Sequence, residues 1–273
     1  MIYLAQLLLL NLVFAHIPHA HFILKKVSEN AGRSTYKITQ EVSFQTSEER
    51  LTVLETWYID DGFQMYLEAK GPQFSYTAKY DLQSKYQVNS NGNLISQRLS
   101  RDFFEGLFHF RNERDLARSL AALNLVSQDV LQPQRRFYNL SEVSYSGQPF
   151  IKLDRVDRST AYKMFNANDA KNPSGIWIEQ DSFHILKIVS PQSATLKASD
   201  YDSFSNGLKL PRLRTIDWGQ NQTPVRVLRV EAIRSNDEIK SLLNHRSLVG
   251  LSKNEFGNTR LSSAVKAFYE RFR

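Results

Sequence analysis

Short runs in which apolar and polar residues alternate recur along most of this chain. The clearest is FQMYLEAKG at 63–71, where Phe63, Met65 and Leu67 fall on one side. A period of two is typical of a half-buried strand. Links of two to four residues join the first runs, which indicates antiparallel hairpins. The expected strands are 36–45, 50–60, 63–71, 74–81, 85–90, 141–147, 149–157, 160–167, 175–180, 183–190, 194–204, 209–218 and 224–233.

Helical periodicity appears in a few places between and after these strands. A short helix is expected at 21–32, a helical lid at about 100–124, a helix near 237–243 and a last helix at 259–273. Neither a linker nor an internal repeat divides residues 16–273. The sequence therefore predicts one domain that is mainly β with helices (α+β), a curved antiparallel sheet covered by α-helices.

The hairpin TWYIDDGFQMYLEAKG at 56–71 decides which residues share a face. A three-residue loop, Asp60-Asp61-Gly62, would pair Ile59 with Phe63 and Trp57 with Met65. A two-residue loop would instead place Tyr58 opposite Met65. We favour the three-residue loop because it gathers the apolar residues, with Glu55 as the one polar exception. The face then consists of Val53, Trp57, Ile59, Phe63, Met65 and Leu67.

This apolar face needs a cover, and the lid is the natural one. Its apolar residues are Phe103, Phe104, Leu107 and Phe108. Sheet and lid together would form either a filled core or the wall of an apolar cavity, and both interpretations remain open.

The first fifteen residues, MIYLAQLLLLNLVFA, are almost wholly apolar and too short to span a bilayer comfortably. They are typical of a secretory signal peptide, with cleavage after Ala15 or, alternatively, after Ala20. We expect an exported, soluble protein in the periplasm of a Gram-negative bacterium. With no cysteine, the chain has no disulfides and no cysteine for lipid attachment.

The net charge of +7 is concentrated in the last part of the chain. Residues 211–273 hold 12 Lys+Arg against 6 Asp+Glu, which is +6 of the total. Such a basic surface attracts lipid headgroups, nucleic acid or acidic proteins, although a solvated basic face is the simpler interpretation. Export argues against nucleic acid as a partner.

Motifs for catalysis are missing: the sequence has no G-x-S-x-G, no phosphate-binding glycine loop, no H-E-x-x-H and no C-x-x-C. We therefore expect neither an enzyme nor a cofactor. His16, His19 and His21 have a spacing that could hold a divalent metal, but a frayed terminus explains them more simply, so no metal site is expected.

The order of these segments resembles a known family. A leading helix runs into YKITQEVSFQ, a strand pair follows around WYIDDGFQMYLEAKG, and a helical insert precedes PSGIWIEQDSFHILKIVSP and SDYDSFSNGLKLPRLRTIDW. This succession, over residues 19 to about 233, resembles the LolA and LolB-like superfamily of periplasmic carriers and receptors of outer-membrane lipoproteins.

The resemblance implies a half-open β-barrel with helices as a lid and an apolar cavity that holds acyl chains. The ten apolar residues named above would line it. The implied partners are lipid or lipoprotein acyl chains and a membrane-bound receptor or donor protein, and we expect a monomer.

In the carrier, an arginine on an early strand gates the cavity; here only Arg50, at the edge of 50–60, is available. The alternative within the same fold is a periplasmic sensor that binds a protein partner and carries no ligand.

Overall fold

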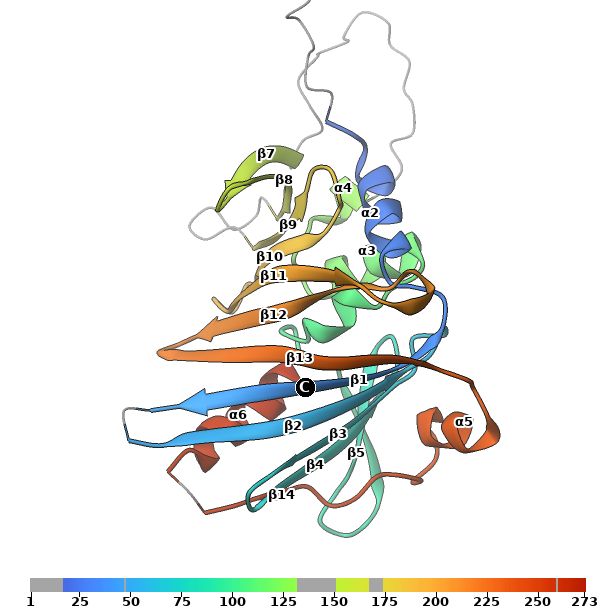
Figure 1. Ribbon diagram of the computed structural model, residues 1–273, viewed down its shortest axis with the longest axis vertical. Helices are drawn as coiled ribbons and strands as arrows, with labels where there is room; N and C mark the ends of the chain where they lie inside the picture. Colours follow the sequence, from blue (N-terminus) through green and yellow to red (C-terminus); the bar gives the residue numbers. More distant parts are fainter. Residues whose placement is uncertain (1–16, 47, 132–150, 167–173, 259) are drawn as a thin grey trace, which may run out of the picture.

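One antiparallel sheet runs through the protein (Figure 1), in the computed structural model that describes residues 17–46, 48–131, 151–166, 174–258 and 260–273. The expected signal peptide at 1–15 and the expected strand at 141–147 lie outside these residues. Within them the strands are β1 (Thr35–Gln45), β2 (Arg50–Ile59), β3 (Met65–Gly71), β4 (Phe74–Tyr80), β5 (Ser84–Val88), β6 (Leu94–Arg98), β7 (Ile151–Val156), β8 (Ser159–Phe165), β9 (Gly175–Glu179), β10 (Ile185–Val189), β11 (Thr195–Ser203), β12 (Lys209–Trp218), β13 (Asn221–Ile233) and β14 (Glu255–Phe256).

The helical segments lie mainly to one side of the sheet (Figure 1). They are α2 (Ala20–Glu29), the 3₁₀ helix η1 (Glu105–Phe108), α3 (Glu113–Ala122), α4 (Gln128–Leu131), the 3₁₀ turn η2 (Ser205–Gly207), α5 (Asp237–Leu243) and α6 (Ser262–Phe272). Among the described residues, no helix is long and apolar enough to cross a membrane.

Two meanders make up the sheet, and the pairing of β1 with β13 joins them. The strand order is β6-β5-β4-β3-β2-β1-β13-β12-β11-β10-β9-β8-β7, and β14 adds to β4. Inward residues meet across the junction, as in the pair Val42 and Val225. The outermost strands of this order, β6 and β7, do not pair with each other, so the curved sheet remains an open half-barrel. The predicted fold class is confirmed.

The predicted register of the hairpin between β2 and β3 is wrong. Ile59 pairs with Met65, and Trp57 pairs with Leu67. The loop closes between Asp60 and Gln64, because the Asp60 carboxylate accepts the backbone N–H of Gln64 at 2.7 Å. The register moves by two residues, which keeps the same side chains on the same face. Phe63 leaves the strand and adopts a left-handed backbone, with φ of 60°.

The lid is less helical than its sequence pattern indicates. Between residues 100 and 110, only Glu105–Phe108 is helical, as a single 3₁₀ turn. More apolar side chains are buried here than one face of an α-helix can cover, so an irregular segment directs them to several sides. They are Phe103, Phe104, Leu107, Phe108 and Phe110. The next helix, α3, begins as expected at Asn112, whose side chain accepts the N–H of Arg114 at 2.8 Å.

Strand β6 was not expected from the sequence. Its residues Leu94–Arg98 are half-exposed or exposed in the structure. Their sequence, LISQR, does not alternate between apolar and polar residues and therefore gives no strand signal. It pairs with β5 from Ser84–Arg98 to Val88–Leu94 and extends the sheet at that end.

Gly32, after α2, provides a test of how tightly the first helix is joined to the sheet. Its φ is +69°, and an added Cβ would lie 2.1 Å from the Tyr36 hydroxyl oxygen. That hydroxyl donates to the backbone oxygen of Ser205 at 3.0 Å. We expect Gly32→Ala to lower the free energy of unfolding by about 2 kcal/mol or more, through backbone strain and this clash. Urea denaturation measures it.

Gly92→Ala is the matched control for that substitution. Gly92 also has a positive φ, +80°, but nothing lies within 4 Å of an added Cβ. The control therefore carries the backbone strain alone. Equal losses in the two variants would contradict the predicted clash at Gly32.

Candidate functional site

The concave side of the sheet carries the apolar face that the sequence indicates. The structure brings all ten predicted residues into one buried cluster, in which the exposed fraction of each is 7% or less. The sheet contributes Val53, Trp57, Ile59, Met65 and Leu67, the β2–β3 loop contributes Phe63, and the lid contributes Phe103, Phe104, Leu107 and Phe108.

Aromatic rings join the sheet to the lid. Phe103 stacks on Tyr80 of β4, with ring centroids 4.8 Å apart. Phe63 stacks on Phe110 with a centroid distance of 4.0 Å. Gly106 allows this approach, since an added Cβ would lie 2.7 Å from the end of the Phe63 ring. The loop residue that left the strand thus fixes the lid segment to the sheet.

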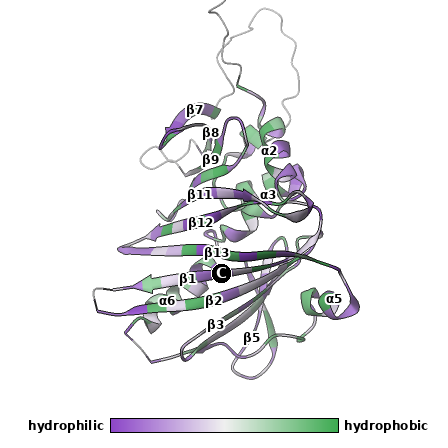
Figure 2. Cartoon of the chain, viewed as in Figure 1, coloured by the Kyte–Doolittle hydropathy of each residue, from purple (hydrophilic) through white to green (hydrophobic). Residues whose placement is uncertain are grey.

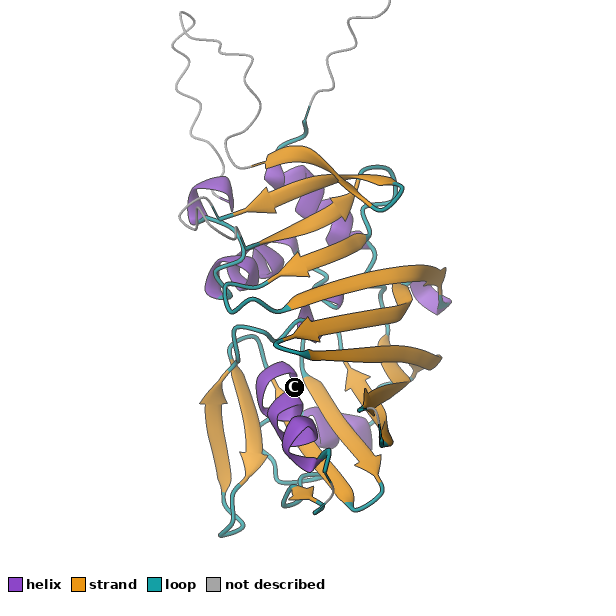
Figure 3. Ribbon diagram, turned by 90° about the vertical axis from the view of Figure 1, so that its left-hand side faces the viewer, coloured by secondary structure: helices purple, strands orange, loops and turns teal. Residues whose placement is uncertain are grey.

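Helix α6 covers the lower part of the concave side, within the curve of the sheet, whereas α2, α3 and α4 lie beside the upper strands (Figure 1 and Figure 3). Its buried residues are Val265, Phe268, Tyr269 and Phe272, which lie on one stripe at helical spacing. The three aromatic rings among them contact both meanders and the lid. The contacts are Phe268 with Phe44 (5.2 Å between centroids), Tyr269 with Tyr76 (4.8 Å), Phe272 with Trp218 (5.6 Å) and Phe272 with Phe104 (5.9 Å).

Three buried carboxylates interrupt this apolar interior. Asp102 pairs with Arg271 of α6, and the other two share one network. Glu55, the polar exception on the predicted face, is fully buried. It accepts from Gln40 Nε2 at 2.6 Å, from Trp57 Nε1 at 3.1 Å and from Arg273 Nε at 2.9 Å. The Arg273 guanidinium also lies 5.7 Å from the Trp57 ring centroid. The residue after α6 is therefore tied to the strand face by charge.

Glu105 of η1 is the second carboxylate of that network. Arg214 of β12 donates from Nη1 to Glu105 Oε1 at 2.6 Å and from Nη2 to Gln40 Oε1. His109 Nε2 lies 3.4 Å from the same Glu105 oxygen, and Arg273 Nη1 lies 3.8 Å from Oε2. Two arginines thus neutralise two carboxylates in a single network, which we call the buried charge cluster: Gln40, Glu55, Glu105, His109, Arg214 and Arg273.

The protonation states of the cluster follow from this arrangement. Burial alone would raise the pKa of Glu105, but Arg214, together with His109 and Arg273, outweighs burial and holds that pKa well below its ordinary value. Burial lowers the pKa of His109, against the opposing effect of Glu105. Glu105 is therefore ionised and His109 neutral near pH 7.

The sequence reasoning missed most of the buried charge cluster, although a signal was present. Gln40 and Arg214 occupy inward positions of alternating strands, between Ile38 and Val42 in the first case and before Ile216 in the second. A polar residue at an inward position needs a buried partner. The partners themselves could not be read from the pattern, because Glu55 and Arg273 are 218 positions apart.

The gate arginine that the family resemblance implies has no counterpart on β2. Arg50 is exposed at the edge of that strand, and the buried arginines of the concave side are Arg214 and Arg273. In the described part of the chain, no group of three or more His, Asp or Glu residues could hold a metal ion.

Known structures share this fold. A LolA superfamily protein from Nitrosomonas europaea aligns over 82% of this chain and 97% of its own, with 10% sequence identity and a TM-score of 0.50. A putative outer membrane lipoprotein-sorting protein domain from Vibrio parahaemolyticus aligns over 82% of this chain and 97% of its own, with 9% identity and a TM-score of 0.48. The predicted resemblance is thus confirmed as a likeness in fold. No protein-family model matches the sequence, and no curated protein is significantly similar to it.

Removing one carboxylate tests the energetics of the buried charge cluster. In Glu105→Gln, Arg214 loses its buried counter-charge, and we expect the free energy of unfolding to fall by about 3–5 kcal/mol. The control is Glu270→Gln, because Glu270 is exposed and lies 3.8 Å from Lys266; it should cost less than about 1 kcal/mol. Chemical denaturation of both variants measures the difference. A loss below 1 kcal/mol in the first variant would contradict the ion pair.

Neutral His109 makes stability depend on pH. In the unfolded chain, His109 takes up a proton below its ordinary pKa of 6.5, whereas burial lowers its pKa in the folded state. Its contribution to stability is therefore complete above pH 6.5 and is lost as the pH falls below it. The melting temperature should decrease from pH 6.5 to 5, and His109→Gln should reduce this slope. His21→Gln is the control, since that side chain is 63% exposed; an equal change in slope there would refute the assignment.

Proposed function

We propose that this protein binds acyl chains of lipids or lipoproteins between its sheet and its helical cover, as a non-enzymatic carrier in the periplasm. The observation that carries the proposal is the cover of the concave face. Helix α6 makes no strand pairing with the sheet and is held by aromatic side chains and a few polar contacts. A cover held in this way can be displaced without breaking the sheet.

The chemistry of the covered surface suits an alkyl chain. Once α6 moves, the sheet and the lid would present a surface that is apolar at Ile38, Val42, Trp57, Met65 and Trp218, with polar side chains of the buried charge cluster among them. Burying an alkyl chain there contributes about 0.8 kcal/mol per CH₂. The likeness in fold to a LolA superfamily protein supports the same class of ligand, and a membrane-bound donor or receptor would complete the transfer.

A second candidate function is a sensor or interaction protein of the same fold that binds a protein partner without a transported ligand. One specific observation favours it: the side chains of α6 already occupy the concave face. The hollow beside the first turn of α6, between Phe74 and Val265, holds only about 10 Å³. In this alternative, the helix is a permanent part of the core.

Direct detection of lipid separates the two candidates. We expect organic extracts of the natively purified protein to contain fatty-acid or phospholipid material in near-stoichiometric amount by mass spectrometry. The same extraction from a protein in which Ile38 and Val42 are both replaced by Asn should yield none. If neither preparation contains lipid and the wild type binds no fluorescent fatty acid, the carrier function is wrong.

Movement of α6 on binding can be followed by tryptophan emission. Trp218 lies 5.6 Å from the Phe272 ring, and Trp57 lies beneath Arg273, whereas Trp177 is hydrogen-bonded to Asp154 on another part of the sheet. In a Trp177→Phe background, a non-fluorescent fatty acid should shift the emission of the two remaining tryptophans.

Phe272→Ala should increase fatty-acid affinity at least several-fold, because truncating the ring frees volume on the face.

The control for Phe272→Ala is Leu24→Ala, which removes a buried side chain of α2 away from α6. It should lower stability without raising affinity. An equal rise in affinity in both variants would mean that general loosening, and not displacement of α6, admits the ligand.

A further inference from the structure

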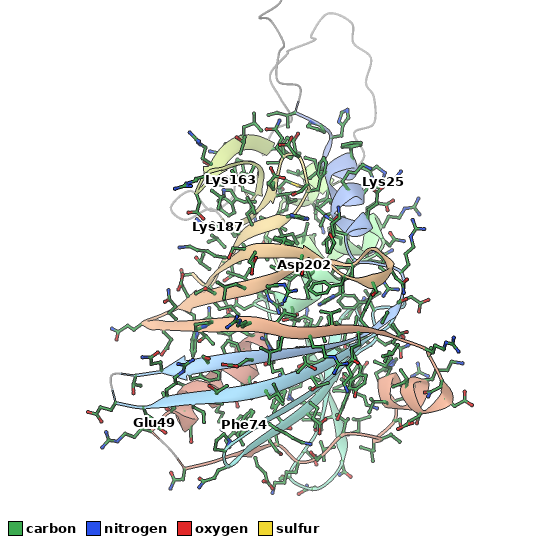
Figure 4. All side chains as sticks on the ribbon, in the orientation of Figure 1. Lys25, Glu49, Phe74, Lys163, Lys187 and Asp202 are labelled. Carbon is green, nitrogen blue, oxygen red and sulfur yellow. The ribbon has the colours of Figure 1, made fainter. Side chains whose placement is uncertain are left out.

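A row of lysines crosses the outer face of the sheet, opposite the apolar face. Strand pairing places Lys152 opposite Lys163, Lys163 opposite Trp177, Trp177 opposite Lys187, and Lys187 opposite Lys197. Residues that are directly paired point to the same side of a sheet. The four lysines and Trp177 therefore form one line across β7 to β11, which we call the lysine row. Figure 4 labels Lys163 and Lys187 over these strands, and Figure 2 shows hydrophilic residues along β7 and β11.

Trp177 organises the middle of the row. The ammonium groups of Lys163 and Lys187 lie 4.6 and 4.8 Å from its ring centroid, one on each neighbouring strand. The indole Nε1 donates to Asp154 Oδ2 at 2.9 Å. The ring is only 5% exposed, because its neighbours cover it. These contacts give the two central lysines defined positions.

The row concentrates four like charges, which Asp154 offsets only in part. Lysines directly opposite one another on paired strands repel. Within the described residues, the four lysines take part in none of the ion pairs, which all involve other residues. Three carboxylates share this face of β7 to β12. Asp154 accepts from Trp177, Glu179 accepts from Ser182 in the next turn, and Asp217, two residues from Thr215, accepts from Gln222. Burial lowers the pKa of Lys163, and Lys152 and Lys187 lower it further, against Asp154.

An exposed apolar side chain lies beside the row. Lys197 pairs with Thr215 of β12, and Leu213, two residues from Thr215, is on the same face with 40% of its surface exposed. Cationic and aliphatic side chains on one open face are the composition of surfaces that bind at the boundary of a bilayer.

We propose that the outer face of β7 to β12 docks on the surface of an anionic phospholipid bilayer, with the lysine row against the headgroup phosphates. All charges of the row are lysines, which act as point charges and lack the fixed geometry of arginine. They suit mobile headgroups better than one fixed epitope on a protein. Strands lie about 4.8 Å apart, so the row is about 19 Å long and spans several headgroups.

This docking does not depend on acyl-chain binding. The lysine row and the apolar face are on opposite sides of the sheet, and neither shares a side chain with the other. A protein that carries no ligand would still dock, and a carrier that failed to dock would still hold lipid in solution.

Vesicle co-sedimentation tests the proposal with the full-length protein. Vesicles of phosphatidylcholine with about 30% phosphatidylglycerol should sediment the wild type at low salt, and vesicles of phosphatidylcholine alone should not. Lys187→Gln with Lys197→Gln should weaken binding roughly 25-fold, about fivefold for each lysine near the surface. The melting temperature should change little, because relief of the repulsion between the two lysines opposes the loss of the contact of Lys187 with Trp177.

The control has the same net charge but keeps the row. Lys240→Gln with Lys266→Gln removes two exposed lysines from α5 and α6, and should weaken binding less than threefold. The proposal is overturned if both double variants lose binding equally, if neutral vesicles bind as well as anionic ones, or if the wild type binds no vesicles. Row-dependent binding to soluble polyglutamate in place of vesicles would also overturn it and would indicate an acidic protein partner.

Discussion

The buried charge cluster is the constraint on which the arrangement of this protein depends. A carboxylate inside an apolar interior is costly unless a cation reaches it. Glu55 stands on the first meander and Arg214 on the second, and each needs a partner from another element. Glu105 brings the lid to Arg214, and Arg273 brings α6 to Glu55. Four separate segments are thus held in one relative position, and the aromatic contacts then fill the space among them.

Much of the fold could be predicted from the sequence because strand periodicity is a local signal. Alternation located most of the strands within two or three residues, and the cap at Asn112 located α3. The hairpin register could not be predicted in the same way. It depends on hydrogen bonds between Asp60 and Gln64, which compete with a tighter loop of nearly the same length. A shift of two residues preserved the apolar face, so the error in register did not change which residues lie inside.

The candidate site was predictable only in its apolar half. Apolar positions such as Trp57 and Met65 are given by the period of the strand, and the structure buries them together. The polar half depends on long-range partners, as between Gln40 and Arg214. The stripe of α6 indicated that something covers it, but not that the helix lies on the concave face of the sheet.

The energetics of that helix explain why one structure is compatible with two proposed functions. Burying the rings of Phe268, Tyr269 and Phe272 contributes roughly 5–9 kcal/mol, at about 1.5–3 kcal/mol for each side chain. Displacing α6 also separates Arg273 from Glu55, which costs about 3–5 kcal/mol more. A 16-carbon chain on the same surface would contribute about 12 kcal/mol. Such a chain would thus offset the burial of the three rings, whereas the remaining contacts of α6, among them buried Val265 and the pair of Arg271 with Asp102, oppose its displacement.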